Sequence, residues 1–405
     1  MKQRLLIGLG ILLLSGCSSL SGLFSSDDNT KRASPLPEYV DTLQVNLLWD
    51  TSVGGGFEDQ VVKLVASVSD ERVFAADRNG LVAAFNKTNG EGLWERETEL
   101  AIAAGPGYGE ALVVVGTSDA EVLALNEDDG SVVWQVEVSS EVLAVPQVAD
   151  GVVVIRTVDG RLYGLDAENG QQKWFYDWKV PVLSLRGTSS PVISDDIVLI
   201  GFATGKLAAL SLQEGDLLWE SSVAIPKGRT DLDRMVDIDS DPVVDDGYIY
   251  VATFQGQLAS LELETGVLLW KRDISAYTGM AIDWGQLYVT DYNSNVLAVD
   301  PSNGASVWKQ IDLTARHLTA PVVQGEYIVV ADFEGYLHWM SRANGAFVAK
   351  LEIDDEGISS TPVVQDGVLY SLTNDGQLAA ISIGDNIPQA IVVEKPESSS
   401  WWKLW

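Results

Sequence analysis

The sequence predicts an all-β protein, an eight-bladed β-propeller of four-stranded antiparallel blades. Three observations lead to this prediction. A Gly-x-x-x-Trp motif recurs along the chain, hairpin turns lie at fixed places in each repeat, and an unpaired N-terminal strand can complete the last repeat. Self-similarity at a period of about 40 to 50 residues is typical of propellers and other arrays, in which each repeat is one supersecondary unit.

The motif marks the end of each repeat. It is found at Gly90/Trp94, Gly130/Trp134, Gly170/Trp174, Gly215/Trp219, Gly266/Trp270 and Gly304/Trp308. A further copy, Gly345/Ala349, lacks the indole, which predicts looser packing there. Each indole is expected to pack against the next blade and to donate its N–H to a backbone acceptor. The predicted docking set is Trp49, Trp94, Trp134, Trp174, Trp219, Trp270 and Trp308. A ligand-binding row of exposed rings is the alternative, but occurrence in every unit favours packing.

One repeat shows how a blade is built. Asp159-Gly160 predicts a hairpin turn, Leu162 to Leu165 a short strand, Asn169-Gly170 a second turn, and the strand that follows ends at Trp174. Asp-Gly and Asn-Gly supply the positive φ angles that tight hairpins need. Two more strands precede these turns, with a Pro-Val-Val signature such as Pro242–Val244. Four strands per repeat make one propeller blade.

The count of repeats predicts how the ring closes. After the copy that ends at Ala349, an eighth unit begins at Asp375-Gly376 and lacks its last strand. The strand Val45 to Asp50, which carries Trp49, can supply it and leave no open seam. Eight blades are therefore predicted, with seven as the alternative.

Composition excludes some classes of function. The chain has 46% hydrophobic residues and a formal charge of −32. A large core is available, so global disorder is excluded. The negative field repels nucleic acid and anionic membrane surfaces, so no nucleic-acid partner is predicted. Solubility, also in a salty habitat, is the simplest reason for the charge; steering of a basic partner is the alternative.

The N-terminus predicts export. Residues 1–16 have a charged start followed by the apolar run Leu5 to Leu14, as in a secretory signal peptide. Leu14–Cys17 resembles a bacterial lipobox, which implies cleavage before Cys17 and lipidation of its thiol. An ordinary signal peptide with an incidental cysteine is the alternative. Because Cys17 is the only cysteine, the mature chain has no disulfide. Ser18, in the lipoprotein sorting pattern that this resembles, favours the outer membrane.

The predicted domains follow from these features. Residues 17–40 form the lipidated cysteine and a flexible Ser-rich tether, residues 41–385 the propeller, and residues 386–405 a C-terminal tail. The tail ends with Trp401, Trp402 and Trp405. Such a tail either anchors at a membrane interface or in a partner groove, or folds back on the propeller.

The repeat resembles the quinoprotein-type (PQQ-like) repeat of quinone-dependent alcohol dehydrogenases and their non-catalytic relatives. Together with the lipobox and the short blades, residues 14–385 resemble the BamB family, lipoproteins of the outer-membrane β-barrel assembly (BAM) machinery. The resemblance implies a non-catalytic scaffold, lipid-anchored in the outer membrane and facing the periplasm. It also implies binding to the periplasmic POTRA domains of BamA, and through BamA to the BAM complex, with nascent β-barrel proteins as further partners.

Two inter-blade segments carry the implied partner site. Pro181–Gly187 and Asp231–Asp239 are similar to Leu-x-Leu-Arg-Gly and Asp-x-Asp segments that face BamA in the family. The resemblance implies contact anchors at Leu183, Leu185 and Arg186, and residues that hold the loop or pair with basic partner groups at Asp237 and Asp239. The alternative is that the leucines are core strand residues and Arg186 a structural ion pair.

Two other functions were weighed. Quinone-dependent dehydrogenases use adjacent cysteines and a calcium site, whereas this chain has a single cysteine. Asp237-x-Asp239-x-Asp241 resembles the start of a calcium loop, but Tyr248 stands where an EF-hand needs Glu. His317 and His338 are too few for a zinc site without cysteines. No catalytic residue, metal or cofactor is therefore predicted. A propeller that binds peptidoglycan or another periplasmic ligand is the remaining alternative.

Overall fold

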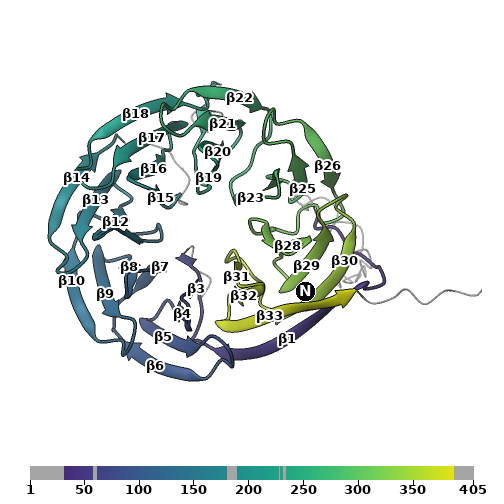
Figure 1. Cartoon of the computed structure of the whole chain (residues 1–405), viewed down its shortest axis with the longest axis horizontal. Helices are drawn as coiled ribbons and strands as arrows, with labels where there is room; N and C mark the ends of the chain where they lie inside the picture. The colour runs from purple at the N-terminus through teal and green to yellow at the C-terminus, as the bar shows by residue number, and fades with distance from the viewer. Residues whose placement is uncertain (1–31, 58–61, 180–188, 228, 231–233, 387–405) are drawn as a thin grey trace, which may run out of the picture.

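The computed structural model describes residues 32–57, 62–179, 189–227, 229–230 and 234–386. Its strands form eight sheets arranged around a central axis, which confirms the predicted eight-bladed all-β propeller (Figure 1). Within these described ranges, no helix is long and apolar enough to cross a membrane.

Each blade is a four-stranded antiparallel sheet whose first strand lies nearest the axis (Figure 1). Blade 1 contains β3 (Ser67–Val68), β4 (Arg72–Ala76), β5 (Leu81–Asn86) and β6 (Gly92–Glu97). Blade 2 contains β7 (Ile102–Gly109), β8 (Leu112–Thr117), β9 (Glu121–Asn126) and β10 (Val132–Glu137), with the short β2 (Lys63–Leu64) parallel to β7. Blade 3 contains β11 (Gln147–Ala149), β12 (Val152–Arg156), β13 (Arg161–Asp166) and β14 (Gln172–Asp177). Blade 4 contains β15 (Val192–Ser194), β16 (Ile197–Gly201), β17 (Lys206–Ser211) and β18 (Leu217–Ser222).

The second half of the ring repeats this plan. Blade 5 contains β19 (Val243–Asp245), β20 (Tyr248–Ala252), β21 (Leu258–Glu262) and β22 (Leu268–Arg272). Blade 6 contains β23 (Met280–Asp283), β24 (Gln286–Thr290), β25 (Val296–Val299) and β26 (Ser306–Gln310). Blade 7 contains β27 (Val322–Gln324), β28 (Tyr327–Ala331), β29 (Tyr336–Ser341) and β30 (Phe347–Glu352). Blade 8 contains β31 (Val363–Gln365), β32 (Val368–Leu372), β33 (Gln377–Asn386) and β1 (Leu43–Ser52).

The ring closes through its two ends. β1 pairs antiparallel with β33, and Trp49 lies opposite Ala380 in the register. The N-terminal strand is therefore the outer strand of the last blade, as the unpaired strand in the sequence predicted. Pairing the two ends of the chain in one sheet gives blade 8 its fourth strand and joins the ends of the ring by hydrogen bonds.

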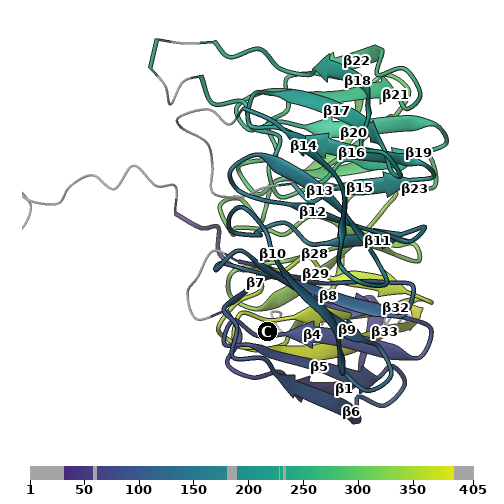
Figure 2. The same cartoon turned by 90° about the vertical axis from the view of Figure 1, so that its left-hand side faces the viewer.

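The propeller has two different faces. The loops that enter each blade lie on one face with the turns between its second and third strands; we call it the loop face. Backbone bonds join them, as where the amides of Phe254 and Tyr292 donate to the carbonyls of Asp237 (2.8 Å) and Ser275 (2.9 Å). The turns between first and second strands lie on the opposite face, the turn face. In Figure 2 the long loops of the loop face project to the left.

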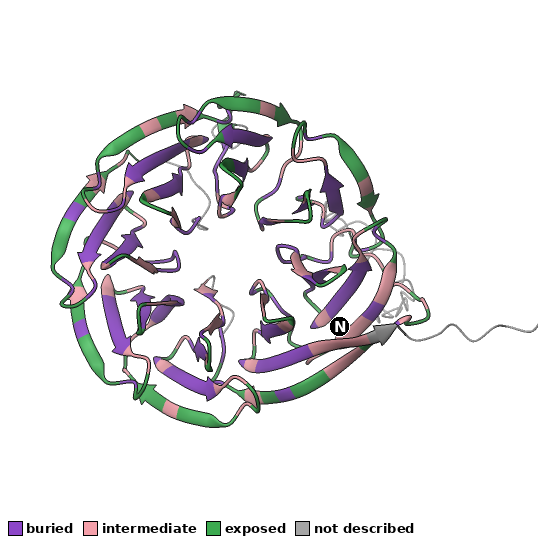
Figure 3. Ribbon diagram, viewed as in Figure 1, coloured by how far each residue is buried: buried purple, intermediate pink, exposed green. Residues whose placement is uncertain are grey.

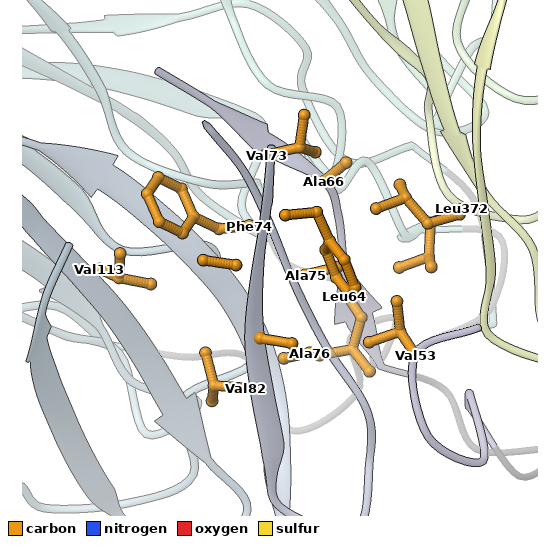
Figure 4. Close-up of a cluster of buried hydrophobic side chains, with 14 of the residues drawn as sticks. Val53, Leu64, Ala66, Val73, Phe74, Ala75, Ala76, Val82, Val113 and Leu372 are labelled. Atoms are coloured by element: carbon orange, nitrogen blue, oxygen red, sulfur yellow. The ribbon is translucent and has the colours of Figure 1, made fainter. Parts of the chain in front are cut away.

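The core lies between neighbouring blades. In Figure 4, Phe74 and Val73 of blade 1 lie among side chains that include Val113 of blade 2 and Leu372 of blade 8, and all four are buried. The outer strands have mostly exposed residues around the rim, whereas the middle strands are buried (Figure 3). Small residues in the middle strands, such as Ala83 and Ala124, let adjacent sheets approach closely.

Each Trp of the repeat spans two blades. Its indole N–H donates to a backbone carbonyl of the next blade at 2.7 to 3.0 Å, and its ring covers the glycine of the next motif. The donor and acceptor pairs are Trp49–Lys87, Trp94–Glu127, Trp134–Ala167, Trp174–Leu212, Trp219–Leu263, Trp270–Pro301 and Trp308–Arg342. A Cβ added to Gly130 would lie 2.6 Å from Cε3 of Trp94. The glycine is therefore required because the preceding Trp occupies the space of a side chain.

The looser packing expected at Ala349 is not found. Trp339 of β29 lies opposite Ala349 in the register and is completely buried, so the large and small residues have exchanged strands. The Trp339 indole donates to Oε1 of Gln324 (2.8 Å), and the Gln324 amide donates to the carbonyls of Gly367 and Ile381 in blade 8. A side-chain bridge thus replaces the direct indole bond at this interface.

Candidate functional site

The first segment implied by the family resemblance falls between β14 and β15, and the described part of the second lies in the loop that enters blade 5, on the loop face. Leu183, Leu185 and Arg186 lie outside the described residues, as does Cys17. Asp237 and Asp239 are described, and so are the residues on both sides of the 180–188 segment. The site can therefore be built from what surrounds the predicted anchors.

The chain before residue 180 is fixed to blade 4. The Trp178 ring stacks on Phe202, with centroids 4.1 Å apart and planes 11° from parallel. The Lys206 ammonium lies 5.4 Å from the Trp178 ring centroid and makes a cation–π contact with the ring. The stack holds the loop where it leaves β14.

The chain after residue 188 is fixed to blade 3. Arg156, at the end of β12, is buried and donates from Nη1 to the Ser189 carbonyl (2.8 Å) and hydroxyl (3.0 Å). The Ser190 amide donates to Oδ1 of Asp241 at 2.5 Å. The loop that enters blade 4 is thereby joined to the loop that enters blade 5.

Asp241 connects a third segment. Its Oδ1 also pairs with Nζ of Lys63, on β2, at 2.7 Å. We call this group the Arg156 network; it consists of Lys63, Arg156, Ser189, Ser190, Asp237, Asp239 and Asp241. It ties together segments that are far apart in the sequence.

Burial and charge oppose each other in this network. Burial lowers the pKa of Arg156 to about 10, against the opposing effect of the charges of Asp239, Asp241 and Asp237. Burial, followed by the nearby charge of Asp237, raises the pKa of Asp239 to about 7. Burial and the charge of Asp237 therefore outweigh the charges of Arg156 and Lys63, which favour the ionised carboxylate of Asp239.

The two aspartates differ in what they can contact. Asp237 is 1% exposed, and its backbone carbonyl accepts a hydrogen bond from the Phe254 amide. Of the two roles implied for Asp237, holding the loop therefore suits its position better than pairing with a partner. Asp239 lines a central cavity of about 1060 Å³, together with Lys63, Asp241 and Tyr292. Among the described residues, no cluster of His, Cys, Asp or Glu could hold a metal ion.

The loop before β19 exposes basic and apolar side chains, although its sequence also contains Asp231 and Asp233. Lys227, Arg229 and Arg234 are exposed there, and Ile225 is 65% exposed. An exposed apolar residue with nearby cations has the composition of a protein–protein contact, in which apolar anchors and arginine are enriched.

Sequence reasoning missed Arg156 and gave Asp241 no role. The repeat contained a signal for Arg156, because the last residue of the second strand is uncharged in every other blade and often small, as at Ala76, Gly201 and Ala252. An arginine at that place in blade 3 breaks the pattern. Comparison of the repeats would therefore have indicated a special residue there, although not its partners.

Comparisons with known proteins agree with this architecture. A family model described as outer membrane protein assembly factor BamB matches residues 78–310 and 293–389. The chain belongs to the BamB family. It is 45% identical to the BamB of Alkalilimnicola ehrlichii over 94% of this chain and 97% of that protein. It is 43% identical to the BamB of Pseudomonas aeruginosa, over 94% and 99%, and 35% identical to that of Escherichia coli, over 94% and 99%.

Solved structures show the same fold. The crystal structure of BamB from Moraxella catarrhalis matches with a TM-score of 0.77 and 27% identity, over 84% of this chain and 100% of that chain. A europium-containing methanol dehydrogenase matches with a TM-score of 0.68 but 12% identity, over 84% and 93%, which shows a shared fold alone. The BamB family is described as an assembly factor, which agrees with the non-enzymatic class predicted from the sequence.

Proposed function

We propose that this chain is a non-catalytic, lipid-anchored assembly factor on the periplasmic side of the outer membrane. It binds the periplasmic POTRA domains of BamA through the loop face of blades 3 to 5 and so assists the insertion of β-barrel proteins. The coarse role in outer-membrane protein assembly rests on membership of the BamB family. The anchor rests on the lipobox at Cys17.

The observation that carries the BamA site is the bridge between the two implied segments. Arg156 holds Ser189, and Asp241 holds Ser190, so the loops before β15 and β19 are joined beside Asp237 and Asp239. A surface fixed before binding loses less conformational entropy when the partner arrives. This supports a role for the network as the base on which Leu183, Leu185 and Arg186 are presented.

The exposed basic and apolar side chains of the loop before β19 suit acidic and apolar groups on the partner. Exposed Lys227, Arg229 and Arg234 add to Arg186 as cations, and Ile225 adds to the leucines as an apolar contact. Complementary charges increase the association rate and exclude wrong partners more than they increase affinity. We therefore assign binding energy to the leucines and orientation to the basic residues.

The test is co-purification from solubilised outer membranes. The double variant Leu185→Glu/Arg186→Glu is expected to lose BamA, as measured by mass spectrometry, while its folding is unchanged by circular dichroism. Leu93→Glu/Arg96→Glu is the matched control, because Leu93 and Arg96 are exposed on β6 of blade 1. The control is expected to retain BamA. Loss of BamA in both variants, or in neither, would refute the proposed face.

A second role, binding of nascent barrel strands, is favoured by the outer rim. Each outer strand is at the end of its described sheet, and several carry exposed apolar pairs, such as Leu217-Leu218 and Leu268-Leu269. An unpaired edge with apolar side chains can add an extended peptide as a further strand. Photocrosslinking from Leu269 tests this role, and the absence of any nascent barrel protein among the crosslinked products would contradict it.

A further inference from the structure

The segment before β1 is bound to blade 7. The Ser34 amide donates to the Thr314 carbonyl (2.9 Å), and Nη1 of Arg316 donates to the Ser34 carbonyl (3.1 Å). Composition alone assigns most of this segment to a flexible tether. It does not reveal these contacts, because the partner residues are almost three hundred positions away in the sequence.

Arg316 is a preformed holder for this segment. It is 1% exposed, and its Nε pairs with Oδ2 of Asp332 (2.7 Å), while Nη2 pairs with Glu334. Its neighbours Ala315 and His317 both have positive φ angles, 60° and 50°. Such strained backbone persists only where the surrounding structure determines it. The guanidinium is therefore fixed by blade 7, with one donor directed at Ser34.

Further contacts continue along the segment. Nζ of Lys350 donates to the Pro37 carbonyl (2.9 Å) and lies 5.2 Å from the Tyr39 ring centroid. The Tyr39 ring stacks on Phe347, with centroids 5.1 Å apart and an interplanar angle of 11°. The Thr42 amide then donates to the Val348 carbonyl (2.8 Å), immediately before β1. Backbone, charge and aromatic contacts thus alternate from Ser34 to Thr42.

The direction of this segment determines where the chain leaves the propeller. Thr314 and Arg316 belong to the loop that enters blade 7 and lie on the loop face, whereas Lys350, Phe347 and Val348 belong to the outer strand β30. Followed backwards from β1, the chain passes along β30 and emerges at the loop face. In Figure 2 its described start, in purple, is on the same side as the long loops.

We propose that residues 34–42 are a strap that blade 7 binds, and that the strap holds the membrane leash at the loop face. This rests on the proposed lipidation of Cys17. The lipid surface then meets the same face that carries the Arg156 network. If residues 17–33 were the flexible coil that the sequence predicts, their r.m.s. reach would be about 23 Å, against about 28 Å for a coil that extended to Thr42. The strap thus selects the side of the propeller that the membrane approaches.

Disulfide trapping tests whether the strap is bound. Ser34→Cys/Thr314→Cys is expected to form a disulfide in the lipoprotein purified without reductant, because the backbones of these residues are hydrogen-bonded. Ser34→Cys/Ser131→Cys is the control, with the second cysteine in the exposed turn before β10 of blade 2. Equal trapping in both pairs, or none in the first, would overturn the strap.

A fluorescence experiment tests which face meets the membrane. The full lipoprotein is reconstituted in vesicles of phosphatidylethanolamine with a minority of phosphatidylglycerol and a nitroxide-labelled lipid. A fluorophore is placed at Gln255→Cys on the loop face or at Asp246→Cys on the turn face, both exposed turn residues at opposite ends of β20. We expect at least twofold stronger quenching at Gln255, and a smaller difference when Tyr39→Ala/Lys350→Ala releases the strap.

Equal quenching at the two positions, or stronger quenching at Asp246, would overturn the proposal. So would a difference that is the same with and without the strap substitutions. The mass of the N-terminal peptide separates the two proposals. A missing acyl mass refutes the anchor of the proposed function together with the leash, whereas failed trapping with the acyl mass present refutes the strap alone.

Discussion

Nη1 of Arg156 donates to both the carbonyl and the hydroxyl of Ser189, at 2.8 and 3.0 Å. This pair joins the second strand of blade 3 to the loop that enters blade 4, in a place shielded from water. Because the next residue, Ser190, is bound by Asp241, the same few atoms also position the loop that enters blade 5. The candidate partner surface therefore depends on a buried cation that does not itself reach the surface.

Arg156→Met is expected to destabilise the protein by about 3 kcal/mol, because it removes the guanidinium that bonds to Ser189 and leaves Lys63 as the remaining positive charge of the network. It should also reduce BamA capture, since Ser189 loses its holder. Urea unfolding and co-purification measure the two effects. Arg156→Lys keeps the positive charge but cannot reproduce both hydrogen bonds of Nη1 to Ser189. It should therefore recover most of the stability but a smaller part of the BamA capture. Unchanged capture by a folded Arg156→Met variant would contradict the role of the network.

Gly130→Ala is expected to disturb the interface of blades 1 and 2. Gly130 has φ +66°, and an added Cβ would lie 2.6 Å from Trp94. Backbone strain of about 1–2 kcal/mol and overpacking of about 1–3 kcal/mol should add. Gly151→Ala is the control, because Gly151 has φ +74° with no atom within 4 Å of the added Cβ. If urea unfolding gave equal losses for the two variants, the Trp would not be the reason for the glycine.

Trp339→Ala is expected to cost about 3–5 kcal/mol, from the cavity and from the Gln324 oxygen left without its donor. Adding Ala349→Trp should not restore stability. Val45 stands four residues before Trp49, where other motifs have the glycine that a docked Trp needs. Only the triple variant Trp339→Ala/Ala349→Trp/Val45→Gly should recover part of the lost stability, because the glycine leaves room for the new Trp. Full recovery of stability by Trp339→Ala/Ala349→Trp alone, measured by thermal unfolding, would contradict this account of the interface between blades 7 and 8.

Asp239→Asn is expected to change how stability depends on pH. The native pKa of Asp239, about 7, is above its usual value, so the native state binds more protons than the unfolded state between about pH 4 and 7. The contribution of Asp239 to stability is therefore present at low pH and is lost as the pH rises through 7. Asparagine removes this loss, so the variant should gain about 1–3 kcal/mol relative to the wild type between pH 5 and pH 8. Urea unfolding at pH 5 and pH 8 measures the stability of the two proteins. The same stability difference between variant and wild type at both pH values would contradict a raised pKa of Asp239.

The ring was predictable because its determinants are local and repeated. Gly90 and Trp94 are four residues apart, and the same motif recurs in blades 1 to 6 with partial copies at Gly345/Ala349 and Trp49, so the blade count and the closing strand follow from the chain itself. The exchange of Trp339 and Ala349 was not predictable from the motif, because the compensating residue lies on a different strand.

The site was only partly predictable for the same reason. The loop segments could be located by their resemblance to a family, but Arg156, Ser189 and Asp241 come from three separate segments of the chain. Nothing local in the sequence links them. The strap depends likewise on Arg316 and Lys350, which are remote in sequence from the residues they bind, Ser34 and Pro37, and reach them only after the ring has closed.

The most direct test of the loop-face account is photocrosslinking in cells from Ile225, which is exposed in the loop that enters blade 5. Leu93, exposed on the outer strand of blade 1, is the comparison position. A crosslinked product containing BamA from Ile225 and none from Leu93 is the result predicted here. BamA crosslinked from Leu93 but not from Ile225 would contradict the assignment of the partner surface to the loop face.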